Sequence, residues 1–145
     1  MHKVINEIKE KISIPILHIA EMTAEKILER KIKNIALLGT KYTMEQNFYK
    51  EKLIEKGINV IIPDKTDIKI INDIIYEELC LGIINPESKT KYLEIIKKLE
   101  KEGAEGVILG CTEIGMLVKK GDTDIPLFDT AVIHAEQAAI YSIEA

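Results

Sequence analysis

Short runs of apolar residues alternate along this sequence with longer segments whose apolar residues recur at helical spacing. The short runs lack the polar alternation of a half-exposed strand and are typical of strands buried on both faces of a sheet. These runs span residues 14–19, 33–39, 58–62, 106–110 and 126–128. The helical segments span residues 3–11, 22–31, 43–56, 67–81, 87–102, 112–119 and 131–143. Strands joined through helices in this order form βα units, so the sequence predicts an α/β fold with a parallel sheet.

Residues that favour helix ends flank several of these segments. Thr23 is predicted to cap the helix of residues 22–31. Thr43, with Gln46 three residues later, matches a capping box at the start of 43–56. Glycines follow three helical segments, where a helix C-terminal glycine belongs, at Gly57, Gly82 and Gly103.

Composition excludes several classes of function. The chain has 145 residues, of which 46% are hydrophobic and 30% charged, as in a globular protein of one domain or two small halves. The net charge of −4 and the single arginine, Arg30 against 19 lysines, argue against a nucleic-acid partner, which requires a basic face. The lysine excess itself is consistent with codon bias. No apolar run approaches the ~18 residues of a membrane span, so we expect no membrane partner.

The two cysteines form no disulfide framework and suit a reducing cytoplasm, which is the expected location. The sequence has no CxxC, no HExxH and no Cys/His cluster, so no metal site is expected.

Ligands of open α/β sheets bind at the carboxyl ends of the strands. In this sequence the rule selects Gly39-Thr40, the turn from Gly110 to Glu113, and Asp129-Thr130.

Cys111 lies where a buried strand meets a helix. Gly110 permits a tight turn there, and the positive end of the helix would favour a thiolate. Such a thiol can serve as a nucleophile, a redox centre or a proton-transfer base, or it can be a small buried side chain. Cys80, between Leu79 and Leu81, is predicted to be a packing residue.

Hydroxyl groups dominate the other two places. Thr40 and Thr43, with the free amides of a helix start, suit a small anion, although capping alone also explains Thr43. Asp129 and Thr130 precede a helix and are explained by capping. His134, in that helix, is interpreted as a partly buried or surface histidine.

Longer motifs resemble one family. GAEGVILGCTEIGMLV, followed by IPLFDTAVIHAEQA, is similar to the C-terminal part of the aspartate/glutamate racemases, and IIYEELCLG, IALLGTKYTM and IPILHIAEMT also match. The GCTE motif resembles the aspartate branch in particular. The resemblance implies two similar α/β domains, usually as a homodimer, with no cofactor and an amino-acid substrate resembling aspartate or glutamate bound between the domains.

The same resemblance implies roles for individual residues. Family members hold two cysteines on opposite faces of the substrate Cα, one removing the α-proton and the other returning a proton. Cys111 matches the second of these cysteines. Thr40, Thr43 and Thr112 match the carboxylate-binding threonines, and Glu113 completes the expected substrate-binding set.

One departure from the family concerns the first catalytic cysteine. In the family this cysteine lies in a CNT-type motif, commonly followed by a sequence like MHK. This sequence begins with Met1-His2-Lys3, so we expect it to lack the motif and its cysteine. We therefore expect residues 18–115 to form a nearly complete second domain, and residues 1–17 and 116–145 to be a remnant of the first. Two-thiol racemisation is expected to fail in this chain alone.

Three alternatives stay open. The chain can be a non-catalytic remnant that binds a small dicarboxylate or only assembles. It can also be a hydantoin racemase, maleate isomerase or malonate decarboxylase relative, or a thiol redox protein.

Overall fold

A parallel sheet of four strands organises the computed structural model, which describes residues 4–144. The strands are β1 (Asn34–Leu38), β2 (Asn59–Ile61), β3 (Val107–Leu109) and β4 (Leu127–Asp129). Their order is β2-β1-β3-β4, so β2 and β4 are the edges, and every neighbouring pair is parallel. The predicted α/β class with a parallel sheet is confirmed.

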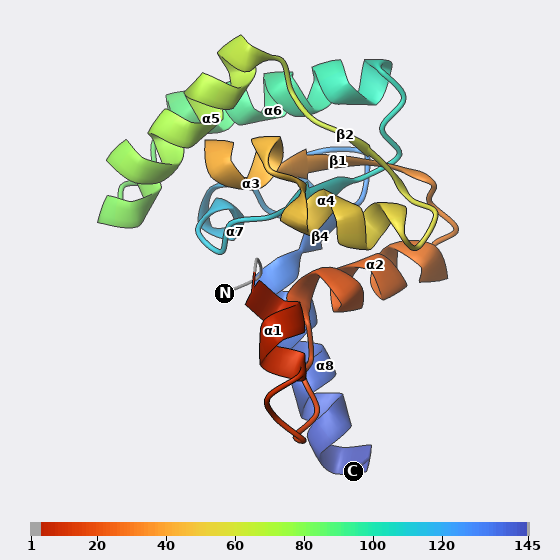
Figure 1. The fold of residues 1–145 in the computed structure, drawn as a ribbon. Coiled ribbons are helices and arrows are strands. Elements are labelled where there is room, and N and C mark those ends of the chain that lie inside the picture. The colour runs from red at the N-terminus through yellow and green to blue at the C-terminus, as the bar shows by residue number, and fades with distance from the viewer. Residues whose placement is uncertain (1–3, 145) are drawn as a thin grey trace.

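Helices lie on both faces of this sheet (Figure 1). They are α1 (Ile5–Lys9), α2 (Ile19–Glu29), α3 (Lys41–Glu45), α4 (Asn47–Ile54), α5 (Lys65–Glu77), the 3-10 helix η2 (Leu79–Leu81), α6 (Pro86–Lys101), α7 (Ile114–Leu117) and α8 (Thr130–Glu144). Alternate residues of β1 enter opposite layers: Ala36 and Leu38 pack with α5 and α6, whereas Ile35 and Leu37 pack with α2 and α4. Burial on both faces explains why the strands read as uninterrupted apolar runs.

The predicted strand at residues 14–19 is wrong. No residue of this run is in a strand, and α2 begins at Ile19, three residues before its predicted start. His18 is the N-cap, because its Nδ1 accepts a hydrogen bond from Ala20 N (3.2 Å). Thr23 is therefore not a cap; it lies inside α2 and donates to Ile19 O (2.7 Å).

The single helix predicted for residues 43–56 is interrupted. Gln46 has an extended backbone (ψ 155°) and separates α3 from α4. Thr40, not Thr43, is the N-cap of α3, and the predicted capping box is absent. The predicted C-terminal glycine is confirmed at Gly57, which has a φ of 77° after α4.

The domain boundary predicted at residue 115 lies in α7, between the neighbouring strands β3 and β4 of this sheet. Val107 N of β3 donates to Pro126 O at the start of β4 (2.9 Å), and α8 packs against α2. Helices α1 and α8 extend away from the sheet in Figure 1. A hydrogen bond from His134 Nε2 to Leu17 O (2.8 Å) ties α8 to the segment between α1 and α2. The assignment of 1–17 and 116–145 to another domain stays a prediction, and the residues Met1 to Lys3 behind it lie outside those described.

Within residues 4–144, no helix combines the length and apolarity needed to cross a bilayer.

Candidate functional site

The carboxyl ends of β1 and β3 meet at two glycines. Gly110 N donates to Leu38 O (2.6 Å), so the two chain segments are in direct backbone contact. A Cβ at Gly110 would lie 2.8 Å from Leu38 O, and a Cβ at Gly39 would lie 3.2 Å from Thr43 Cβ. The close approach at Gly110 leaves no room for a side chain. It brings the turn containing Cys111 beside the segment of Thr40 and Thr43.

Thr40 and Thr43 form a pair of half-buried hydroxyl groups at this junction. Their Oγ1 atoms are 3.2 Å apart, and Thr43 N donates to Thr40 Oγ1 (3.3 Å). Two of the amides at this helix start are already bonded, that of Thr43 to Thr40 and that of Lys41 to Asn72 Oδ1 (2.9 Å). An anion at this place would therefore be bound by hydroxyl groups and not by those two amides.

Cys111 and Thr112 share one acceptor in the turn after β3. The Cys111 thiol donates to Glu113 Oε2 (2.8 Å), and Thr112 Oγ1 donates to the same oxygen (2.9 Å). These hydrogen bonds, that from Cys111 first, lower the pKa of Glu113. Glu113 is therefore held as a carboxylate against the thiol.

The thiolate predicted at Cys111 is not favoured. Burial of the half-buried side chain, and then its hydrogen bond to Glu113, raise the pKa of Cys111 to about 12. Helix α7 is only four residues long and begins three residues after the thiol, so its dipole is outweighed. At neutral pH Cys111 is a thiol, which can give a proton directly but becomes a base only after losing its own.

Cys80 does not fill the predicted packing role. It is exposed on η2, whereas its neighbour Leu79 is buried. Of the causes that raise the pKa of Cys111, charge at Cys80 is the smallest. Both cysteines are free thiols.

Capping by Asp129 is confirmed at the carboxyl end of β4, the third strand end that the sequence selects. Its Oδ1 accepts from Ala131 N (3.1 Å) and Val132 N (3.2 Å) at the start of α8. Thr130 Oγ1 instead donates to Leu109 O (2.9 Å) and ties α8 to the end of β3. A Cβ at Gly115 would overlap the other carboxylate oxygen of Asp129, so this carboxylate packs directly on α7.

Two residues at the site escaped the sequence interpretation. Asn72 of α5 holds the start of α3, and the buried Tyr92 of α6 has a pKa raised by burial and then by charge at Cys111. Helical periodicity marks Tyr92 as a core position, but no local pattern connects either residue to strand ends far away in sequence.

No group of three or more His, Cys, Asp or Glu side chains able to hold a metal ion occurs in the described part of the chain.

The family model for Asp/Glu/hydantoin racemases matches residues 1–138. The chain belongs to this family. A broad specificity amino-acid racemase of Bacillus subtilis (strain 168), RacX, is 26% identical over 138 residues, which cover 93% of this chain and 58% of RacX.

Solved structures agree with this membership. A Yersinia pestis protein provisionally assigned as an Asp/Glu racemase is 53% identical with a TM-score of 0.94, over 99% of this chain and 63% of that chain. An aspartate racemase homologue from Pyrococcus horikoshii OT3 is 38% identical with a TM-score of 0.89, over 97% of this chain and 62% of that chain. The chain thus spans less than two thirds of the length of these two racemase-family structures.

Proposed function

We propose that this chain carries one half of an amino-acid racemase centre of the aspartate/glutamate type. In this proposal Cys111 exchanges the α-proton of the substrate, and Thr40, Thr43 and Thr112 bind its α-carboxylate. The observation that supports it best is the backbone contact at Gly110, which sets the Cys111 turn beside the paired threonine hydroxyls. Family membership and the relatives named above as racemases support the reaction class.

The hydrogen bond between Cys111 and Glu113 holds the proton on the thiol, so Cys111 must lose this proton to solvent before it can act as a base. The thiolate then removes the α-proton from one face of Cα. Hydroxyl groups on the α-carboxylate stabilise the negative charge that develops as the proton leaves. Return of the proton from Cys111 restores the same configuration. Glu113 was predicted to bind substrate; in this proposal its carboxylate instead orients the Cys111 thiol and opposes its ionisation.

Inversion also needs an acid on the opposite face of Cα. The family's two-cysteine mechanism supplies a second thiol, but Cys80, the other cysteine of the 145, is exposed on η2. We propose that the second acid is not among these residues, and that the chain alone does not racemise. A homodimer, a cytoplasmic location and the absence of a cofactor belong to the same proposal.

A binding-only function is the second candidate, in which the chain holds a small dicarboxylate without chemistry. The raised pKa of Cys111 favours it, because a protonated thiol removes no proton.

Incorporation of solvent deuterium at Cα separates the two candidates. The purified chain is incubated in D2O with L- and D-aspartate and L- and D-glutamate, followed by proton NMR and chiral chromatography. Exchange in one enantiomer without inversion is the expected result for one-sided proton transfer; by resemblance to glutamate racemases this enantiomer is the L-form. Inversion would show that a second acid is present. Binding without exchange would leave only the second candidate.

A further inference from the structure

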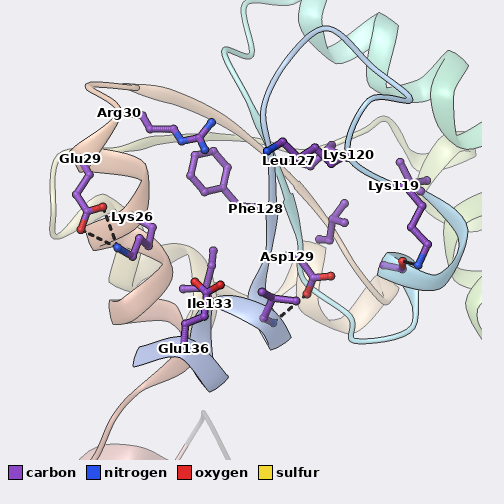
Figure 2. Close-up of a pocket in the computed structure, with 14 residues that line it drawn as sticks. Lys26, Glu29, Arg30, Lys119, Lys120, Leu127, Phe128, Asp129, Ile133 and Glu136 are labelled. Carbon is purple, nitrogen blue, oxygen red and sulfur yellow. Dashed lines mark hydrogen bonds and ion pairs between the residues drawn. The ribbon is translucent and has the colours of Figure 1, made fainter. Parts of the chain in front are cut away.

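A groove runs along the free edge of the sheet, apart from the threonines and the cysteine described above. Its main cavity, of about 560 Å³, is lined by α2, β4, α8 and residues 115–120 (Figure 2). A second cavity, of about 430 Å³, extends from it toward residues 121–126. Both volumes are in the range of small-molecule sites. Arg30, Lys120 and Leu127 line both cavities, so they mark the middle of the groove.

Arg30 and Lys120 are cations without an acidic partner. Neither forms an ion pair with any residue between 4 and 144, whereas Lys26, which lines the same groove, pairs with Glu29. The guanidinium of Arg30 lies over the ring of Phe128, with its Cζ 5.6 Å from the ring centroid. Figure 2 shows this stack beside β4. Stacking on the ring face orients the guanidinium but leaves its N–H donors available.

The identity of Arg30 adds a second, independent observation. It is the single arginine in a chain with 19 lysines. A lysine would supply the same charge, but only arginine offers a planar fork that both stacks on an aromatic ring and binds two oxygens of one phosphate. The guanidinium at this position therefore offers a geometry that none of the 19 lysines can supply.

The other residues that line the groove indicate which kind of anionic ligand would fit beside Arg30 and Lys120. Leu127 and the exposed Val132 give it an apolar wall, whereas Phe128 is buried beneath the Arg30 guanidinium. Two carboxylates that line the groove already have partners. Glu29 is paired with Lys26, and Asp129 caps α8. The remaining acids that line the two cavities are Glu136 and Asp124. Glu136 lines only the main cavity and Asp124 only the second, whereas Arg30 and Lys120 line both, so an anion is expected between these two cations.

We propose that this groove binds a small organic phosphate. Its dianionic group lies between Arg30 and Lys120, and its apolar body lies on Leu127, which lines both cavities. Two cations and an apolar wall match a phosphate ester better than a free inorganic ion or a monocarboxylate. The inference does not depend on the proposed racemase chemistry.

The test is a titration of the ¹⁵N-labelled chain with phenyl phosphate, followed by amide chemical shifts. The expected result is saturable shifts at Arg30, Lys120 and residues 127–129. Binding should be at least tenfold weaker in Arg30→Lys and in Lys120→Gln, and unchanged in Lys97→Gln, a matched control on an exposed lysine of α6 without an ion pair. Inorganic phosphate and benzoate should each bind at least tenfold more weakly than phenyl phosphate.

Other outcomes overturn the proposal. Unchanged affinity in Arg30→Lys would remove the role of the guanidinium, and equal loss in Lys97→Gln would show non-specific charge attraction. Equal binding of inorganic phosphate would remove the role of the apolar wall, and equal binding of benzoate the preference for a dianion. Absence of saturable shifts at residues 127–129 would exclude the site. Circular dichroism of each variant confirms that the fold is kept, which is expected because both changed side chains are exposed.

Discussion

Ionisation of Cys111 offers a quantitative test of the site. Burial and the Glu113 carboxylate raise the pKa of its thiol to about 12, from an ordinary value of 9.0. Each pKa unit changes the thiolate population tenfold, so at pH 8 the Cys111 thiolate is about 1,000 times scarcer than that of a free cysteine. Because the thiolate is the nucleophile, alkylation by iodoacetamide should be slower. The higher nucleophilicity of a more basic thiolate offsets part of the difference in population, which leaves a rate roughly 30- to 60-fold lower.

Replacing Glu113 with Gln separates the two causes. The substitution removes the negative charge beside the thiol but leaves its burial, which is the larger cause. The pKa of Cys111 should fall part of the way, and alkylation at pH 8 should become several-fold faster. Thr112→Val is the matched control, because it removes the other hydrogen bond to Glu113 Oε2 and keeps the carboxylate against the thiol.

The assay follows mass-labelled Cys111 between pH 7 and pH 11 in a Cys80→Ala background. Restricted access of the reagent lowers the rate equally at every pH, whereas a raised pKa makes the rate climb tenfold per pH unit throughout this range. A plateau near pH 9 in the unchanged site would refute the reasoning. So would a slower rate in Glu113→Gln, because it would mean that the carboxylate promotes the thiolate.

Three further predictions concern the surrounding structure. Gly110→Ala should lower the free energy of unfolding by about 1–3 kcal/mol, measured by urea titration, because the new Cβ would lie 2.8 Å from Leu38 O. Thr40→Val should lower the free energy of unfolding by about 1 kcal/mol, because the α3 cap is lost. Thr43→Val should lower it less, because the Thr43 side chain caps no helix. Both substitutions should weaken aspartate binding. Glu105 accepts from two backbone amides at the start of β1, which lowers its pKa, so its stabilising contribution is present above the unfolded value of about 4.3 and is lost as the pH falls through the lower folded value. The difference in urea midpoint between the unchanged chain and Glu105→Gln should therefore shrink between pH 5 and pH 3; a difference that stays constant would contradict the contribution of the charge.

The parallel sheet could be predicted because its strands are buried on both faces and therefore read as apolar runs. The same signal misled at residues 14–19, where an apolar run precedes a helix and no strand pairs with it. Periodicity cannot distinguish these cases in a short run. The His18 cap was also missed, since histidine is not among the usual capping residues.

The site was predictable only where one local segment carries the information. The turn at Gly110 and the cysteine after it were found from the strand-end rule. The protonation state of Cys111 could not be predicted from the sequence. Its pKa depends on burial, which a sequence pattern does not measure, and on the Glu113 carboxylate, which the sequence analysis assigns to substrate binding. The arrangement of Thr40 over Thr43 depends on the break of the helix at Gln46, for which the helical pattern of 43–56 gives no warning.

The measurement that tests the central claim most directly compares Cys111→Ala with Cys80→Ala in the α-deuterium exchange of aspartate and glutamate. The account predicts that the unchanged chain and Cys80→Ala both exchange the α-proton of one enantiomer at similar rates, and that Cys111→Ala exchanges none. Exchange that persists in Cys111→Ala, or that is lost in Cys80→Ala, would contradict the assignment of Cys111 as the residue that moves the proton.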